Sequence, residues 1–189
     1  MPTEIVRKYA HVWGEDPTAL LREYVYQAAL TNKLASIDTG ELNLATFYEM
    51  VLWKLNRFPV IDGELLAELG TVKAILPSSY KDVEPILKRM LQCAGIALPM
   101  ASTILRFLNP NTFQIIDDRV YRIVLPGRVK YPSKPTQLNQ AYLDNSVRIY
   151  FEYLGELRKL SCDELPYSKA DRILYQLDIK LGNQIGDKG

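Results

Sequence analysis

The stretch that decides the fold is Cys93–Arg122, which reads CAGIALPMASTILRFLNPNTFQIIDDRVYR. It begins with a turn at Gly95, and Pro99 then takes the first position of a helix whose apolar residues recur every three to four positions. The apolar run FQII follows between turn residues, so we expect an extended connector rather than a strand of a sheet. The acidic pair Asp117-Asp118 comes next and begins another helix. The stretch therefore predicts a helix, a connector and a second helix, with two carboxylates where the second helix begins.

The rest of the chain continues the helical pattern on both sides of this stretch. Residues that can cap a helix precede the apolar periodic segments: Asp16, Asn43, Asp62, Ser79 and Ser168. Pro17 follows the first of these caps directly, so we predict one helix over residues 15–30. On the helix that follows Asn43, the predicted apolar stripe includes Leu44, Tyr48, Val51 and Leu55.

No pair of segments shows the alternating pattern of matched strands, so the predicted fold class is all-α. The composition, 48% hydrophobic and 24% charged, is that of an ordinary globular protein. A chain of 189 residues is long enough to bury a core without disulfides or metals. We expect a two-lobed helical bundle that forms a single domain over residues 1–189, with a flexible tail at 183–189.

Composition also limits the classes of function. The two cysteines are too few for an iron–sulfur cluster or a four-cysteine zinc site, and no metal site is predicted. The first residues lack a basic segment followed by an apolar one, and no apolar run reaches the length of a membrane span. These features predict a cytoplasmic protein, with a monomer favoured. The formal net charge of +1 does not by itself indicate nucleic-acid binding, so any such site must come from local clustering.

The spacing within the opening stretch resembles that of the helix-hairpin-helix DNA glycosylase superfamily (HhH-GPD). Gly95-Ile96-Ala97 occupies the Gly-apolar-Gly position of the family's hairpin. Ile116-Asp117 then lies where the family has an apolar residue and its catalytic aspartate, with Val120 and Arg122 in register. The helix-hairpin-helix unit would cover about residues 80–108. The resemblance implies a DNA-glycosylase-like fold for the helical bundle.

The resemblance also implies an activity and a set of contacts. Asp117 would be the catalytic residue of a base-excision repair enzyme. Pro99 stands where bifunctional members carry a nucleophilic lysine, so hydrolysis without a lyase step is expected. The backbone of Gly95, Ile96, Ala97 and Pro99 would hold a phosphate of double-stranded DNA. No cofactor is implied beyond a structural monovalent cation at the hairpin, and a DNA-binding protein of this kind would be associated with the nucleoid.

The chemistry of base excision explains why an aspartate belongs at this position. Cleavage of an N-glycosidic bond passes through a sugar with positive, oxocarbenium-like character, which an ionised carboxylate stabilises while it orients water. The alternative reading is an ordinary helix cap, because aspartate accepts hydrogen bonds from the first N–H groups of a helix. The family register favours Asp117 for the chemistry and leaves Asp118 to cap the helix or to pair with a basic residue.

A basic segment follows the acidic pair. No acidic residue occurs between Asp118 and Asp144, whereas five basic residues do: Arg119, Arg122, Arg128, Lys130 and Lys134. Such a segment can follow a phosphate backbone, and the first four of these residues are predicted DNA contacts. The alternative is a solvated loop and helix face with no nucleic-acid role.

Aromatic residues offer walls for a flipped base. Trp53 lies opposite the predicted apolar stripe of its helix, so that helix is either central in the bundle or lines a cleft. If it lines a cleft, Trp53 is a stacking candidate, and Tyr121 is a second one. The leading hypothesis is therefore a monofunctional DNA glycosylase. The alternatives are a catalytically inactive DNA-binding module of the same fold and a helical protein-interaction module.

Overall fold

The computed structural model describes residues 3–14, 16–24, 28–38, 42–54 and 61–184. These residues form α-helices and short 3-10 helices (η), and no strand occurs among them, so the all-α prediction is confirmed. In chain order the elements are α1 (Glu4–Lys8), α2 (Ala10–Trp13), η1 (Pro17–Glu23), α3 (Ala28–Ala35), α4 (Leu44–Lys54), α5 (Gly63–Thr71), η3 (Val72–Ala74), η4 (Pro77–Val83), α6 (Glu84–Gln92), α7 (Leu98–Leu108), α8 (Asp118–Val124), α9 (Gln140–Leu160) and α10 (Tyr167–Lys180).

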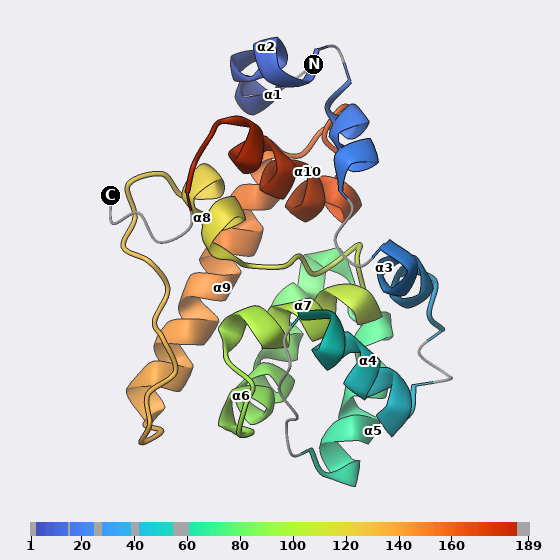
Figure 1. The fold of residues 1–189 in the computed structure, drawn as a ribbon. Coiled ribbons are helices and arrows are strands. Elements are labelled where there is room, and N and C mark those ends of the chain that lie inside the picture. The colour runs from blue at the N-terminus through green and yellow to red at the C-terminus, as the bar shows by residue number, and fades with distance from the viewer. Residues whose placement is uncertain (1–2, 15, 25–27, 39–41, 55–60, 185–189) are drawn as a thin grey trace.

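The helices pack in two groups that share one core (Figure 1). In the first group α10 packs against α2, η1 and α8, and in the second α7 packs against α4, α5 and α6. The long helix α9 contacts α8 and α10 at one end and α6 at the other, so it connects both groups. The segment between α7 and α8 passes from the second group to the first. This arrangement leaves a junction between the groups, where the candidate site lies.

Local capping explains where several helices begin. The side chain of Asp62 accepts a hydrogen bond from the backbone N–H of Leu65 at 2.7 Å, and Asn43 accepts one from Thr46 at 3.0 Å. Asp16 caps η1 in the same way, through the N–H of Thr18 at 2.9 Å. These bonds satisfy N–H groups that have no partner within the helix. All three predicted caps are therefore confirmed.

One predicted helix is divided, and two predicted helix starts are wrong. The helix predicted over residues 15–30 is divided, because the 3-10 helix η1 ends at Glu23 and α3 begins at Ala28. Ser79 lies inside η4 and its hydroxyl donates to the carbonyl of Leu76, so the α-helix begins only at Glu84. Ser168 lies within α10, whose N-cap position is held by Pro166. At Ser79 and Ser168 the capping propensity of a serine therefore does not decide where the α-helix begins.

The predicted stripe of α4 is wrong in part. Leu44 is exposed, while Phe47, Met50, Val51 and Trp53 are buried. Leu55 and residues 185–189 of the predicted flexible tail lie outside the described residues. Within the described ranges, none of the helices combines the length and the apolar character that are needed to cross a bilayer.

Candidate functional site

The connector before α8 is fixed on both sides by buried hydrogen bonds. It is extended over residues 113–117, as predicted, and Phe113 and Ile116 are fully buried. The hydroxyls of Tyr150 and Tyr153 on α9 donate to the carbonyls of residues 114 and 115, at 3.0 and 2.6 Å. A hydroxyl on α7, that of Ser102, accepts from the N–H of Ile116 at 3.1 Å. These bonds fix the position of Asp117 at the start of α8.

Asp117 is the N-cap of α8. Its Oδ1 accepts a hydrogen bond from the backbone N–H of Val120 at 2.9 Å. Burial raises the pKa of the Asp117 carboxyl, and the positive charge of Lys54 together with the backbone N–H bonds opposes that shift. The capping role that the sequence left open for Asp118 therefore belongs to Asp117.

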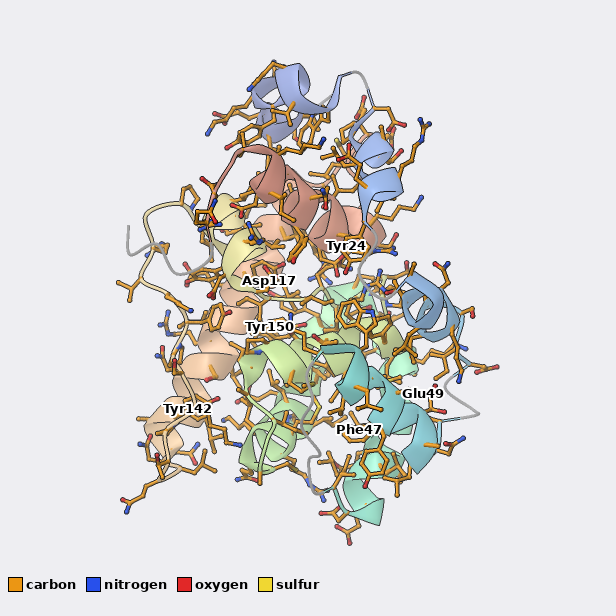
Figure 2. All side chains as sticks on the ribbon, in the orientation of Figure 1. Tyr24, Phe47, Glu49, Asp117, Tyr142 and Tyr150 are labelled. Atoms are coloured by element: carbon orange, nitrogen blue, oxygen red, sulfur yellow. The ribbon has the colours of Figure 1, made fainter. Side chains whose placement is uncertain are left out.

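A pocket of about 350 Å³, measured to its open mouth, lies in front of this carboxylate. We call it the junction pocket, because its lining comes from both helix groups: Tyr24, Trp53, Lys54, Ile115, Asp117, Asp171, Arg172 and Tyr175. Figure 2 shows Tyr24 and Asp117 in the middle of the molecule, between the two groups. The pocket combines aromatic walls with several charged groups.

The junction pocket brings together two residues that the sequence singled out, Asp117 and Trp53. Trp53 is 3% exposed, its indole N–H donates to the Thr31 hydroxyl at 2.5 Å, and its ring packs edge-on against Phe107 at 5.1 Å. The two interpretations of α4 are thus compatible, because the indole is buried in the core and also lines the pocket. These contacts hold the ring in one orientation, as a stacking surface requires.

Tyr121 does not line the junction pocket. Its hydroxyl donates to the backbone carbonyl of Val129 at 3.1 Å, and its ring packs edge-on against Tyr131. The side chain is therefore used to hold the loop that follows α8, which explains why it does not reach the pocket where Trp53 lies.

The sequence analysis missed the contribution of α10. Asp171, Arg172 and Tyr175 line the pocket from this helix, and Tyr24 joins them by packing edge-on against Tyr175. Asp171 is 2% exposed and lies 3.3 Å from the Nε atom of Arg106, which is equally buried. A signal was present, because Asp171 shares one helix face with apolar residues three and six positions later. Acidic residues on an apolar face are rare unless they are paired or functional.

Arg119 and Arg122 bind a buried carboxylate. Asp178 on α10 is fully buried, and it accepts hydrogen bonds from Arg119 at 2.8 Å and from the Nε of Arg122 at 2.6 Å. The same two guanidinium groups also donate to the backbone carbonyls of Asn183 and Gln184. Both arginines therefore connect α8 to α10 and to the chain that follows it, and their DNA contacts stay a prediction.

The other basic residues of this segment are also paired, but at the surface. Lys130 lies 2.6 Å from Asp118, which accepts a further hydrogen bond from the Tyr131 hydroxyl at 2.6 Å. Arg128 lies 3.1 Å from Glu152 of α9. Lys130 and Arg128 are 60% and 65% exposed, so these pairs are weak and can exchange for other anions. Asp118 has the pairing role that the sequence allowed for it.

The turn between α6 and α7 holds an internal cation. Gly95 has φ 82°, a left-handed conformation that favours glycine, and the turn leads into α7 with Ala97 at the N-cap. The ammonium group of Lys134 donates to three backbone carbonyls of this turn, those of Leu91 at 2.5 Å, Cys93 at 2.6 Å and Ile96 at 3.0 Å. The carbonyl oxygens near the predicted monovalent-cation site are thus bonded to a cation of the chain itself. Phosphate binding by Gly95, Ile96, Ala97 and Pro99 stays a prediction.

Comparison with protein-family models, with curated proteins and with solved structures gives no significant match to this chain. The chemistry of the junction pocket therefore rests on its own residues and their geometry.

Proposed function

We propose that the protein is a DNA-glycosylase-like enzyme that hydrolyses the N-glycosidic bond of a base flipped out of double-stranded DNA. The observation that carries this proposal is the Asp117 carboxylate, which lies at the start of α8 and opens into an aromatic pocket. The pocket has aromatic walls beside that carboxylate and is too small for a folded partner. Its residues supply the two things that base excision needs, namely surfaces for stacking and a carboxylate for the sugar.

Each part of the pocket has a role in this chemistry. The ring of Trp53, with Tyr24 and Tyr175, would enclose the flipped base. The Asp117 carboxylate, in its ionised form, would stabilise the positive charge that develops on the sugar and would orient the attacking water. Lys54 favours that ionised form through its positive charge. The exposed Arg128 and Lys130 on the loop after α8 would contact the phosphate backbone beside the pocket.

The test is an excision assay on duplexes that carry oxidised, alkylated, deaminated or mismatched bases. Asp117→Asn keeps a side chain that can cap α8 but removes the charge, so we expect excision to fall about 100-fold to 1000-fold. Asp118→Asn is the matched control, because it changes the adjacent carboxylate, which pairs with Lys130 outside the pocket. If Asp117→Asn excises bases at the wild-type rate, Asp117 is not the catalytic residue.

The same assay tests hydrolysis without a lyase step. Lys54 is the only lysine among the described residues that line the pocket, and Pro99 cannot form a Schiff base. We expect no covalent protein–DNA adduct when borohydride is added during excision. An adduct that disappears in Lys54→Arg would show that the enzyme also uses an amine nucleophile.

A second candidate is a DNA-binding module of the same shape without catalysis. It is favoured by the burial of Asp117, which raises the pKa of that carboxyl and so disfavours the ionised form that catalysis needs. In that case duplex DNA would bind with a strong dependence on salt, and no substrate in the panel would be cleaved. If the protein neither binds duplex DNA nor cleaves any substrate, both candidate functions are wrong.

A further inference from the structure

In the part of the chain that the structure describes, the guanidinium of Arg172 lies in the junction pocket without a partner. Its backbone N–H donates to Asp171 at 2.7 Å, but among the described residues its guanidinium has no hydrogen-bond acceptor and no carboxylate within ion-pair distance. The Nε atom is buried, and the side chain as a whole is partly buried. Burial and the nearby positive charge of Arg106 lower the pKa of Arg172, which reflects an unfavourable position for an unpaired cation.

The nearest carboxylate does not relieve this position. Asp171 lies 3.3 Å from the Nε atom of Arg106, and both side chains are buried. A buried donor that has no acceptor is unfavourable, and such groups in folded proteins usually have a specific reason. Because Arg172 lines a pocket that is open to solvent, a ligand can provide the missing acceptor.

The other lining residues limit what that ligand can be. Asp117 and Asp171 place two carboxylates in the pocket, which disfavours a phosphate or another strongly anionic group beside them. The rings of Tyr24, Trp53 and Tyr175 favour a flat, weakly polar molecule. A neutral heterocycle with a carbonyl oxygen satisfies both conditions and accepts from a guanidinium.

We propose that Arg172 selects bases that carry a keto group, such as the deamination products uracil and hypoxanthine, and disfavours bases that carry an amino group at the same position. This inference rests on the proposed function, because it takes the occupant of the pocket to be a nucleobase. A guanidinium has only donors, so it can bond to a carbonyl oxygen, whereas an exocyclic amino group would bring two donors together.

The test measures binding of free bases by titration calorimetry, in two pairs that differ at one exocyclic group. Hypoxanthine is compared with adenine, and uracil with cytosine. We expect the wild-type protein to bind the keto member of each pair at least 10-fold more tightly. Arg172→Met should bring the two members within about 3-fold, because it keeps the length of the side chain and removes its donors. Arg172→Lys should restore part of the preference.

The controls separate selection from folding. Thermal unfolding of Arg172→Met should occur at or above the wild-type temperature, since the guanidinium has no described partner to lose and its burial is unfavourable. Arg148→Met is the matched control, because this arginine is 66% exposed on α9, away from the pocket lining. It should leave the keto preference unchanged.

The outcomes distinguish this inference from the proposed function. Keto-selective binding that depends on Arg172, without excision of any base, would support the inference and contradict the enzyme. Excision that depends on Asp117, with equal losses for keto and amino bases in Arg172→Met, would overturn the inference alone. Tighter binding of amino bases by the wild-type protein, or no binding of any base, would also overturn it.

Discussion

The Asp117 carboxylate caps α8 and lies in a pocket that disfavours its charge. The first role needs only an oxygen that accepts from the N–H of Val120, and an asparagine provides one equally well. The second role, in the proposed chemistry, needs the ionised form. At this single residue, stability and activity therefore make different demands.

We predict that Asp117→Asn stabilises the protein at neutral pH. Burial raises the pKa of Asp117 above the ordinary value of 3.8, so its folded state favours the protonated carboxyl. Its contribution to stability is complete below pH 3.8 and is lost as the pH rises through the raised pKa. The gain in Asp117→Asn should therefore be absent in acid and should grow towards neutral pH. Urea unfolding of both proteins across this range measures it.

Asp118→Asn should show the opposite sign. Partial burial alone would raise the pKa of Asp118, but the bonds from Lys130 and Tyr131 outweigh it and lower that pKa. Its contribution is present above the ordinary value of 3.8 and is lost as the pH falls through the lowered pKa. Asp118→Asn should thus be less stable than wild type at neutral pH. A loss of the same sign in both variants would contradict the assignment of cap and ion pair.

At the scale of elements, the turn between α6 and α7 depends on Lys134. Three backbone carbonyls, those of Leu91, Cys93 and Ile96, accept hydrogen bonds from its ammonium group at 2.5 to 3.0 Å. We predict that Lys134→Met lowers the free energy of unfolding by about 1–3 kcal/mol, the usual cost of leaving buried polar groups unsatisfied. Urea unfolding measures the change.

The same variant tests whether the turn can hold a free ion. Carbonyl oxygens are ligands for K⁺ and Na⁺, so either ion should restore part of the stability of Lys134→Met, and tetramethylammonium at equal concentration should not. Lys130→Met is the control, because the Lys130 side chain is 60% exposed and its loss should change stability by less than about 1 kcal/mol. Equal effects of all three salts would indicate general screening and would rule out a specific site.

The docking of α8 on α10 depends on a buried ion-pair cluster. Asp178 is fully buried and binds both Arg119 and Arg122. Asp178→Asn leaves two guanidinium groups without their carboxylate, and we expect a loss of about 3–5 kcal/mol in the free energy of unfolding. Asp144→Asn, which removes a half-exposed partner of Lys88, should cost less than about 1 kcal/mol. Similar losses in the two variants would contradict a special role for the cluster.

At the scale of the whole molecule, the helices could be predicted from the sequence because their signals are local. Asn43 and Asp62 each lie next to the apolar pattern that they introduce, and the Asp117-Asp118 pair marks the start of α8. The predicted helix boundaries were wrong where packing between distant segments decides the boundary. Tyr24 leaves the helical conformation and packs its ring against Tyr175, which lies far along the chain.

The pocket could be predicted only in part, for the same reason. Asp117 and Trp53 were found from a spacing and a helix face, whereas Asp171 and Arg172 reach the pocket only because α10 packs against η1 and α8. The basic segment was harder to interpret. Arg119 looks unpaired in the sequence, and its carboxylate partner lies on a helix more than fifty positions later.

The distribution of paired cations gives a prediction for DNA binding by the whole protein. Arg119 and Arg122 are committed to a buried carboxylate, so the exposed Arg128 and Lys130 should make the phosphate contacts. Each contact releases counterions, and its removal should reduce the slope of log K against log salt by roughly 1. We therefore expect Arg128→Gln and Lys130→Gln each to flatten the salt dependence measured by fluorescence anisotropy on duplex DNA. Lys73→Gln, which removes an equally exposed lysine paired with Asp38 in the second helix group, should leave it unchanged. A slope that responds equally to all three substitutions would mean that DNA binds through overall charge, without a surface beside the junction pocket.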